Sequence, residues 1–276
     1  MDAYAFHLLD NHQEIVDRFL ATCQADERIV AAFFGGSYAT GKVDEYSDLD
    51  LFFITTDEAY EDFLSAKESF IRLLGKPLFL EDFGEPHGYL TIYSNGTEAE
   101  VFFYPESTYQ DLYEGPYRVL LDKKGILTGK VFPVHAAESA KQIMILRQQM
   151  DWFWHELSHF IKAMGRSQLW FAYGELELLR QCCVNLARLR YNFSDPYMGE
   201  PYFKIEQVMP VEQLAPLERT ICPLEYDAML QASLVILRFY QAVVPALAEE
   251  HGIPYQVELE QMMVRHLEEL DAAGMR

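Results

Sequence analysis

Two short apolar runs on either side of a glycine-containing turn constrain the fold of this chain most. Residues 28–34 are rich in β-branched and aromatic side chains and end at Gly35-Gly36, and residues 49–55 form a second run of the same kind. Runs of this length that stop at turn residues are typical of buried strands. We therefore expect a sheet in the N-terminal part of the chain, with these two strands in its core.

The rest of the pattern divides the chain into a mixed part and a helical part. Residues 10–24 and 58–74 have helical spacing of apolar side chains, and further strand candidates are 77–80, 89–93, 98–104 and 117–122. Beyond Pro133 the pattern is helical over 136–164, 167–191, 211–248 and 254–271, with a loop over 193–210. The predicted fold class is α+β: a mixed sheet with helices in a domain of residues 1–133, followed by an all-α helical bundle of residues 134–276.

Asp48 and Asp50, at the start of the second strand, form the strongest candidate site. They lie two residues apart, so their carboxylates project from one face of the strand, while Leu49, Leu51 and Phe53 face the core. Two carboxylates held close together raise each other's pKa, and a divalent cation removes that repulsion. Mg²⁺, which prefers oxygen ligands and a substrate phosphate, suits such a pair.

The segment Gly35-Gly36-Ser37 follows the first strand, and ten residues separate it from Asp48. Glycine lets the backbone approach a phosphate closely, and the backbone N–H groups together with the Ser37 hydroxyl can bind phosphate oxygens. Taken alone, two acids at the start of a strand are often ordinary turn residues. In combination with the glycine–serine turn they predict a site for Mg²⁺ and a nucleoside triphosphate.

This arrangement resembles the polymerase-β-like nucleotidyltransferase superfamily, and especially the lincosamide and aminoglycoside antibiotic nucleotidyltransferases. The matching residues are Gly36 and Ser37, the spacer residue Gly41, and the pair Asp48 and Asp50. The resemblance implies that the acids hold Mg²⁺ and that the glycine and serine hold the outer phosphates of ATP. It also implies transfer of a nucleoside monophosphate to a hydroxyl of a small antibiotic-type acceptor, with release of pyrophosphate.

The resemblance further implies a third carboxylate from a neighbouring strand. Glu98 and Glu100 lie on one face of their strand, and we favour Glu100, because it lies deeper in the strand and in the lincosamide type is the base that acts on the acceptor hydroxyl. A charged edge strand that prevents aggregation is the structural alternative. Lys42 is a candidate phosphate contact, although many relatives carry a basic residue before the spacer glycine, where this chain has Thr40.

His155-Glu156-Leu157-Ser158-His159, on a predicted helix, is a rival motif. In metallopeptidases the two histidines of such a motif bind zinc and the glutamate activates water, and Glu177 offers a third ligand here. The apolar stripe of the helix passes to one side of both histidines, so we expect an ordinary histidine pair on the bundle surface and no stoichiometric zinc. A zinc metallopeptidase is the alternative function, beside a non-catalytic nucleotide-binding protein of toxin–antitoxin type.

Glu175, on the following helix, is a carboxylate on an apolar face, and such a group is costly to bury without a partner. It could pair with an arginine such as Arg180 or Arg188, or it could bind a cationic acceptor. We therefore regard Glu175, Glu156 and Tyr173 as candidate acceptor contacts and the helical bundle as the acceptor-binding domain.

The formal net charge of −21 disfavours nucleic acid as a partner and attracts cations, including a cationic small molecule. The four cysteines show neither metal spacing nor a disulfide framework, and the N-terminus lacks the features of a signal peptide. The longest apolar stretch, 232–248, is interrupted by Arg238, Gln241 and Pro245, which argues against a membrane span. We expect a cytoplasmic monomer or homodimer without a membrane partner.

Overall fold

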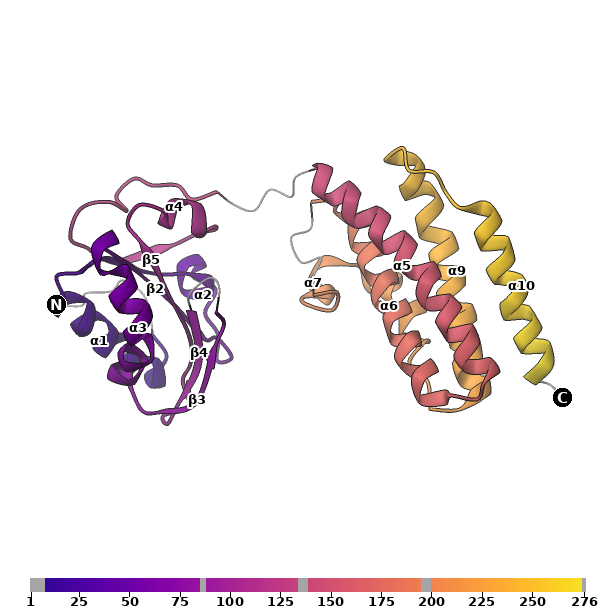
Figure 1. The fold of residues 1–276 in the computed structure, drawn as a ribbon, viewed down its shortest axis with the longest axis horizontal. Helices are drawn as coiled ribbons and strands as arrows, with labels where there is room; N and C mark the ends of the chain where they lie inside the picture. Colours follow the sequence, from indigo (N-terminus) through magenta and orange to yellow (C-terminus); the bar gives the residue numbers. More distant parts are fainter. Residues whose placement is uncertain (1–7, 85–87, 134–138, 195–199, 275–276) are drawn as a thin grey trace. The chain divides into compact units, whose positions relative to one another are not determined.

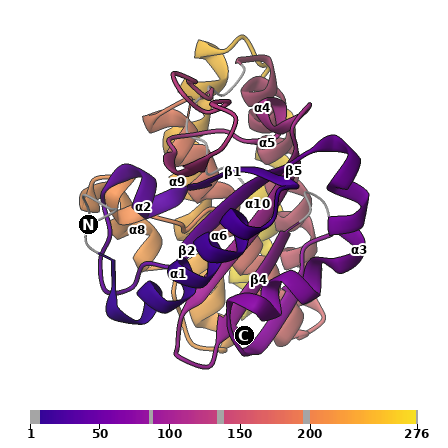
Figure 2. The same ribbon diagram turned by 90° about the vertical axis from the view of Figure 1, so that its left-hand side faces the viewer.

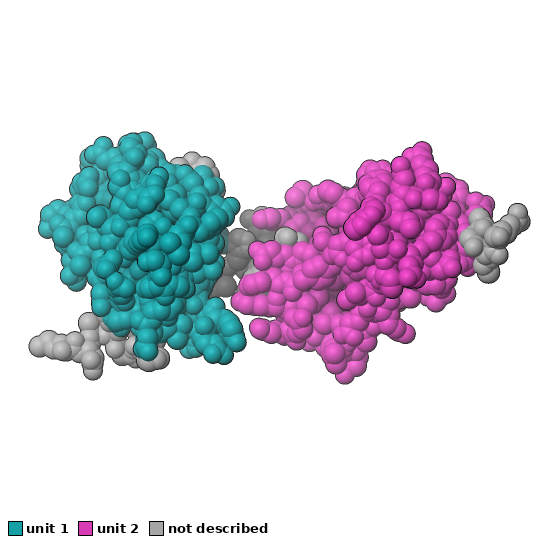
Figure 3. Space-filling view, turned by 90° about the horizontal axis from the view of Figure 1, so that it is seen from below, with its two compact units in different colours: residues 1–135 teal, residues 136–276 magenta. Residues whose placement is uncertain are grey.

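The computed structural model describes residues 8–84, 88–133, 139–194 and 200–274 (Figure 1). The chain divides into two units, Met1–His135 and Ala136–Arg276, which Figure 3 distinguishes by colour. The expected domain boundary after residue 133 adjoins segment 134–138, which lies outside the described residues. The first unit combines a sheet with helices and the described part of the second is helical, so the predicted α+β fold class is confirmed.

The first unit is built on a mixed sheet. Its strands are β1 (Ile29–Phe34), β2 (Leu49–Thr55), β3 (Pro77–Asp82), β4 (Gly88–Tyr93), β5 (Glu98–Pro105) and β6 (Arg118–Asp122). Its helices are α1 (Asp10–Ala25), α2 (Gly36–Thr40), α3 (Asp57–Leu74) and α4 (Tyr109–Leu112). The strand order is β3-β4-β5-β2-β1-β6, in which β2 and β5 run parallel and the other neighbours run antiparallel.

The two faces of the sheet have different cores. Helices α1 and α3 cover one face, where Leu49, Leu51 and Phe53 of β2 are buried as the alternation predicts (Figure 2). On the other face Phe52 stacks between the rings of Phe33 and Phe102, with centroid separations of 5.0 and 5.2 Å. Because alternate residues of a strand share a face, the acids that precede Phe52 project from this second face.

The second unit is a helical bundle. Its helices are α5 (Ser139–Gly165), α6 (Leu169–Tyr191), α7 (Ile205–Val208), α8 (Val211–Glu218), α9 (Tyr226–Glu250) and α10 (Val257–Gly274). Residues 211–248, predicted as one helical stretch, instead form α8 and α9 with a break between them. Pro223 lies in this break, and proline has no N–H to donate to a helix. A short helix, α7, lies within the expected loop 193–210.

Helix α9 is long and apolar enough to cross a membrane by length and composition alone. Its buried side chains, among them Ile236, Tyr240 and Val244, belong to the main core of the bundle. The apolar character of α9 is therefore explained by its place among the other helices of this unit (Figure 1).

Candidate active site

The parallel pairing of β2 and β5 brings the predicted acids together. Asp50 pairs directly with Glu100 across the two strands, so the two side chains leave the same face of the sheet. Asp48 immediately precedes β2, its charge acts on both Asp50 and Glu100, and both aspartates are partly buried. Glu98 is exposed, whereas Glu100 is partly buried. Of the two candidates for a third carboxylate, Glu100 is thus the one that pairs with Asp50 and is the more buried.

Asp48, Asp50 and Glu100 together are called the acid group here. Their carboxyl groups repel one another at a position that water reaches poorly. Burial, then the charges of Asp48 and Glu100, raise the pKa of Asp50 from 3.8 to about 7. Burial, then the charges of Asp48 and Glu98, also raise the pKa of Glu100. A divalent cation that binds oxygen ligands would relieve this repulsion, so the donor set suits Mg²⁺.

The glycine–serine turn leads from β1 into α2 and packs against the acid group. Gly36 has a φ of +45°, and a Cβ at that position would lie 1.8 Å from Oδ2 of Asp50, so glycine is required on both counts. The Ser37 hydroxyl oxygen is buried and has no hydrogen-bond partner among the described residues. A small anionic group held at this turn would satisfy that oxygen, so the turn fits the predicted phosphate-binding role.

Arg118 is a basic residue near this turn that the sequence did not single out. It opens β6 and pairs with Phe34, the residue before Gly35, and its Nη2 atom lies 3.7 Å from the position of a Cβ on Gly41. Lys42, the basic residue predicted for this role, is exposed, and its backbone N–H donates to the carbonyl of Ser37. No local signal could reveal Arg118, because only the pairing of β6 with β1 brings it to the turn.

A polar cavity of about 240 Å³ lies beside Asp48. Its lining includes His12 and Asn11 of α1, Tyr46 and Ser47 of the spacer, and Glu98 of β5. Nδ1 of His12 lies 2.7 Å from the Tyr38 hydroxyl, and burial lowers the pKa of His12 while the charge of Asp48 opposes that shift. The cavity therefore borders the predicted site at Asp48.

The raised pKa of Asp50 predicts how stability depends on pH. Between about pH 4 and about pH 7 the folded protein keeps a proton that the unfolded chain loses, so the contribution of Asp50 to the free energy of unfolding falls as pH rises through this window. We expect Asp50→Asn, which cannot ionise, to melt several degrees above the wild type at pH 8 and close to it at pH 4. Thermal melts of both proteins across this pH range, without divalent cations, test the prediction. A difference in melting temperature that does not change with pH contradicts it.

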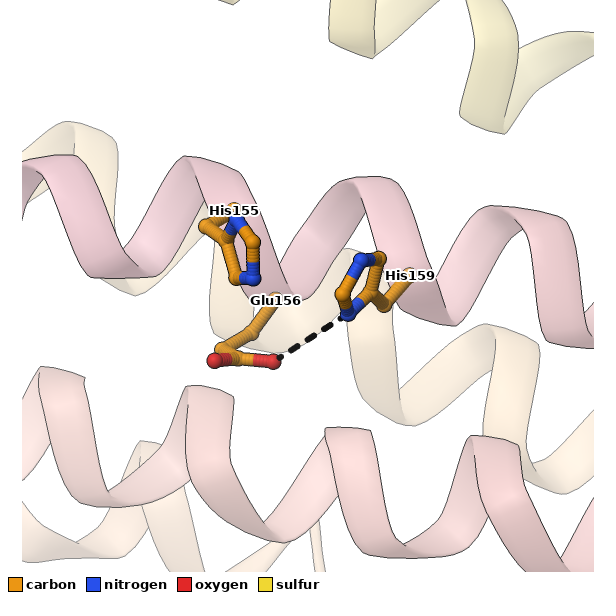
Figure 4. A group of neighbouring side chains, drawn as sticks. All are labelled: His155, Glu156 and His159. Carbon is orange, nitrogen blue, oxygen red and sulfur yellow. Dashed lines mark ion pairs between the residues drawn. The ribbon is translucent and has the colours of Figure 1, made fainter.

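A second group of charged side chains lies wholly within the helical unit. His155, Glu156 and His159 project from one side of α5, and the ligand atoms of the three lie within 4.8 Å of one another (Figure 4). The two histidines reach the surface, as the helical pattern predicts, but Glu156 turns inward and is only 5% exposed. Glu177, the suggested third ligand, instead forms an ion pair with Arg180.

Glu175 of α6 is the acid that joins this group. It is 5% exposed, and burial, then hydrogen bonding and charge from the neighbouring Glu156, raise its pKa. Of the two suggested arginine partners, Arg180 binds Glu177 and Thr220, and Arg188 donates to the carbonyls of Pro201 and Phe203. The sequence identified Glu175 as an acid needing a partner, but not that the partner is a second acid.

Tyr173, the third suggested acceptor contact, is 38% exposed on α6. Two nearby tryptophans in the sequence of α5 differ from each other in exposure. Trp152 is 46% exposed, whereas Trp154 is buried in the core of the bundle, where its ring packs against Phe153 and Tyr240. Trp154 is therefore a core residue.

Comparison with known proteins identifies the family. The streptomycin adenylyltransferase family matches residues 9–270, which is nearly the whole chain. The chain belongs to this family. It is therefore a nucleotidyltransferase, and the predicted resemblance to the antibiotic nucleotidyltransferases is confirmed.

Comparisons with solved structures and with curated proteins add little to the family assignment. The crystal structure of an aminoglycoside 6-adenyltransferase from Bacillus subtilis is similar to this chain, with 18% sequence identity and a TM-score of 0.44. The similarity covers 95% of this chain and 99% of that one. No curated protein matches the chain.

Proposed function

We propose that this nucleotidyltransferase transfers AMP from ATP to a hydroxyl group of a small antibiotic-type acceptor, in a Mg²⁺-dependent reaction that releases pyrophosphate. The observation that carries the proposal is the acid group itself. Asp50 and Glu100 face each other on neighbouring parallel strands, with Asp48 on the same face and the turn at Gly36 packed against them. An acid group beside a phosphate-binding turn is the combination that nucleotidyl transfer needs.

Asp48, Asp50 and Glu100 would hold the Mg²⁺. When bound, the ion neutralises part of the charge of the triphosphate and of the acids and stabilises the charge that develops on the leaving pyrophosphate. The raised pKa values of Asp50 and Glu100 support this assignment, because they show that the uncompensated acid group is under electrostatic strain.

The other residues bind the triphosphate and accept a proton. The backbone at Gly36 and the Ser37 hydroxyl hold the outer phosphates, with positive charge supplied by Arg118 and, as the sequence suggests, by Lys42. Glu100, which pairs with Asp50 across the two strands, takes the proton from the acceptor hydroxyl. The acceptor oxygen then forms a bond to the α-phosphorus, the bond from that phosphorus to the bridging oxygen breaks, and pyrophosphate leaves.

The acceptor is proposed to be of the aminoglycoside or lincosamide kind. The family is described as streptomycin adenylyltransferases, and the net charge of −21 favours a cationic acceptor over nucleic acid. Acceptor binding by Glu156, Glu175 and Tyr173 stays a prediction, as do the cytoplasmic setting and the monomeric or dimeric state.

A screen of acceptors tests the proposed function. Purified protein is mixed with Mg²⁺, one of the four common ribonucleoside triphosphates and one acceptor: streptomycin, a deoxystreptamine aminoglycoside or a lincosamide. We expect pyrophosphate release and a nucleotidylated product with ATP and at least one acceptor, and neither without Mg²⁺. Pyrophosphate release that does not depend on any acceptor, or no product across the whole panel, contradicts the proposal.

A further inference from the structure

The buried acids Glu156 and Glu175 form a pair whose negative charge a bound cation would stabilise. Each is about 5% exposed, and Glu175 of α6 interacts with Glu156 of α5. Oε2 of Glu175 is buried without a hydrogen-bond partner in the described part of the chain. Two carboxyl groups enclosed together are unfavourable unless a proton or a cation compensates them, and an unpartnered oxygen adds to that cost.

Two imidazoles lie beside this pair of acids. The rings of His155 and His159 have centroids 4.3 Å apart, and Nδ1 of His159 lies 3.8 Å from Oε2 of Glu156 (Figure 4). Donor atoms of a tetrahedral zinc site lie about 3.4 Å apart, given bonds of about 2.1 Å. The ligand atoms of His155, Glu156 and His159 already lie within 4.8 Å of one another. Shifts of roughly an ångström in the positions of the two histidine rings would bring the donors to that spacing.

We propose, in place of the zinc-free surface histidine pair expected from the sequence, that His155, Glu156 and His159 bind a Zn²⁺ ion, with the neighbouring Glu175 supporting Glu156 from α6. Two imidazoles and one carboxylate form a common zinc ligand set, and the helical spacing of the histidines puts both on one side of α5. Glu175 comes from α6, so an ion bound by Glu156 would be coupled to the second helix through the interaction of these two acids. Imidazole ligands distinguish this site from the acid group of the sheet, whose oxygen ligands suit Mg²⁺.

The burial of Glu156 separates this site from that of a metallopeptidase. In such enzymes the glutamate of the motif must reach a metal-bound water to act as a base. Here the side chain of Glu156 is buried beside Glu175, so it is not free to act as a base on a metal-bound water. The proposed zinc site accordingly has a structural role, in which it holds α5 and α6 together, and it implies no peptidase activity.

Metal titration of the full chain tests the proposal. Protein stripped with chelator is titrated with Zn²⁺ or Co²⁺ alone, and metal content is measured after gel filtration. We expect one Zn²⁺ per chain, the visible absorption of tetrahedral Co²⁺, and a rise of at least about 3 °C in the melting temperature. Because no nucleotide or acceptor is present, this result is independent of the proposed function.

Single-residue variants with a matched control show which side chains bind the Zn²⁺ ion. His155→Ala and His159→Ala change surface side chains and should abolish stoichiometric binding, whereas His266→Ala, at an exposed position on α10, should retain it. Glu156→Gln and Glu175→Gln should each weaken binding about 10-fold or more. Unchanged affinity in Glu156→Gln reduces the site to a surface histidine pair and overturns the proposal.

Two other outcomes also overturn it. One is the absence of bound Zn²⁺ in the wild-type protein. The other is a Glu175→Gln variant whose zinc affinity is normal but whose KM for the acceptor is raised, because that result makes the buried acids the acceptor contacts that the sequence suggested.

Discussion

Asp48→Asn and Asp50→Asn should each reduce turnover roughly 100-fold or more while the protein stays folded. Each change removes one negative oxygen ligand from the acid group without changing the size of the side chain. Asp50→Asn also removes a charge that is raised in energy by burial and by its neighbours, so this variant should be no less stable than the wild type at neutral pH. Loss of activity without loss of stability identifies a residue retained for function.

Steady-state rates with saturating ATP, acceptor and Mg²⁺ measure the effect, and circular dichroism confirms the fold. Asp62→Asn, on the exposed face of α3, is the matched control and should leave turnover within about 2-fold of the wild type. Raised Mg²⁺ should restore part of the activity if the variants bind the ion more weakly. Near-normal turnover in either Asp48→Asn or Asp50→Asn contradicts the metal-binding assignment.

Glu100→Gln should lower kcat by about 100-fold, and Glu98→Gln by less than about 3-fold. The two glutamates lie on one face of β5, but Glu100 pairs with Asp50 and is partly buried, whereas Glu98 is exposed. A glutamine at position 100 keeps the shape of the side chain and cannot accept a proton, so the base is lost with little change in packing.

The pH profile separates a base from a purely structural acid. If Glu100 is the base, the wild-type kcat falls on the acidic side as Glu100 becomes protonated, and this limb disappears in Glu100→Gln. Glu100→Asp, which keeps a carboxylate, should recover part of the rate. A larger loss in Glu98→Gln than in Glu100→Gln would transfer the role to Glu98.

Much of the N-terminal unit follows from local sequence. The strand at residues 49–55 and its alternation are predictable because side chains on opposite faces of a strand meet different surroundings. The turn at Gly36 is predictable because a backbone with positive φ that packs against a carboxylate tolerates only glycine. These features depend on a few consecutive residues, so the family resemblance could be seen there.

Features that depend on pairing between distant segments could not be predicted in this way. Periodicity over 211–248 does not show that the helix breaks near Pro223. Arg118 reaches the glycine–serine turn only because β6 pairs with β1, and nothing in the residues around Arg118 indicates that pairing.

The acidic side chains show most clearly which features follow from local sequence and which from tertiary structure. The sequence by itself determined that Asp48 and Asp50 share a face, because two residues on one strand have a fixed geometry. Only the tertiary structure decided that Glu100 meets Asp50, since the register of two parallel strands is set by contacts across the sheet. Only the tertiary structure, likewise, placed Glu175 against Glu156, because helical periodicity gives the direction of each side chain but not which helix packs against which.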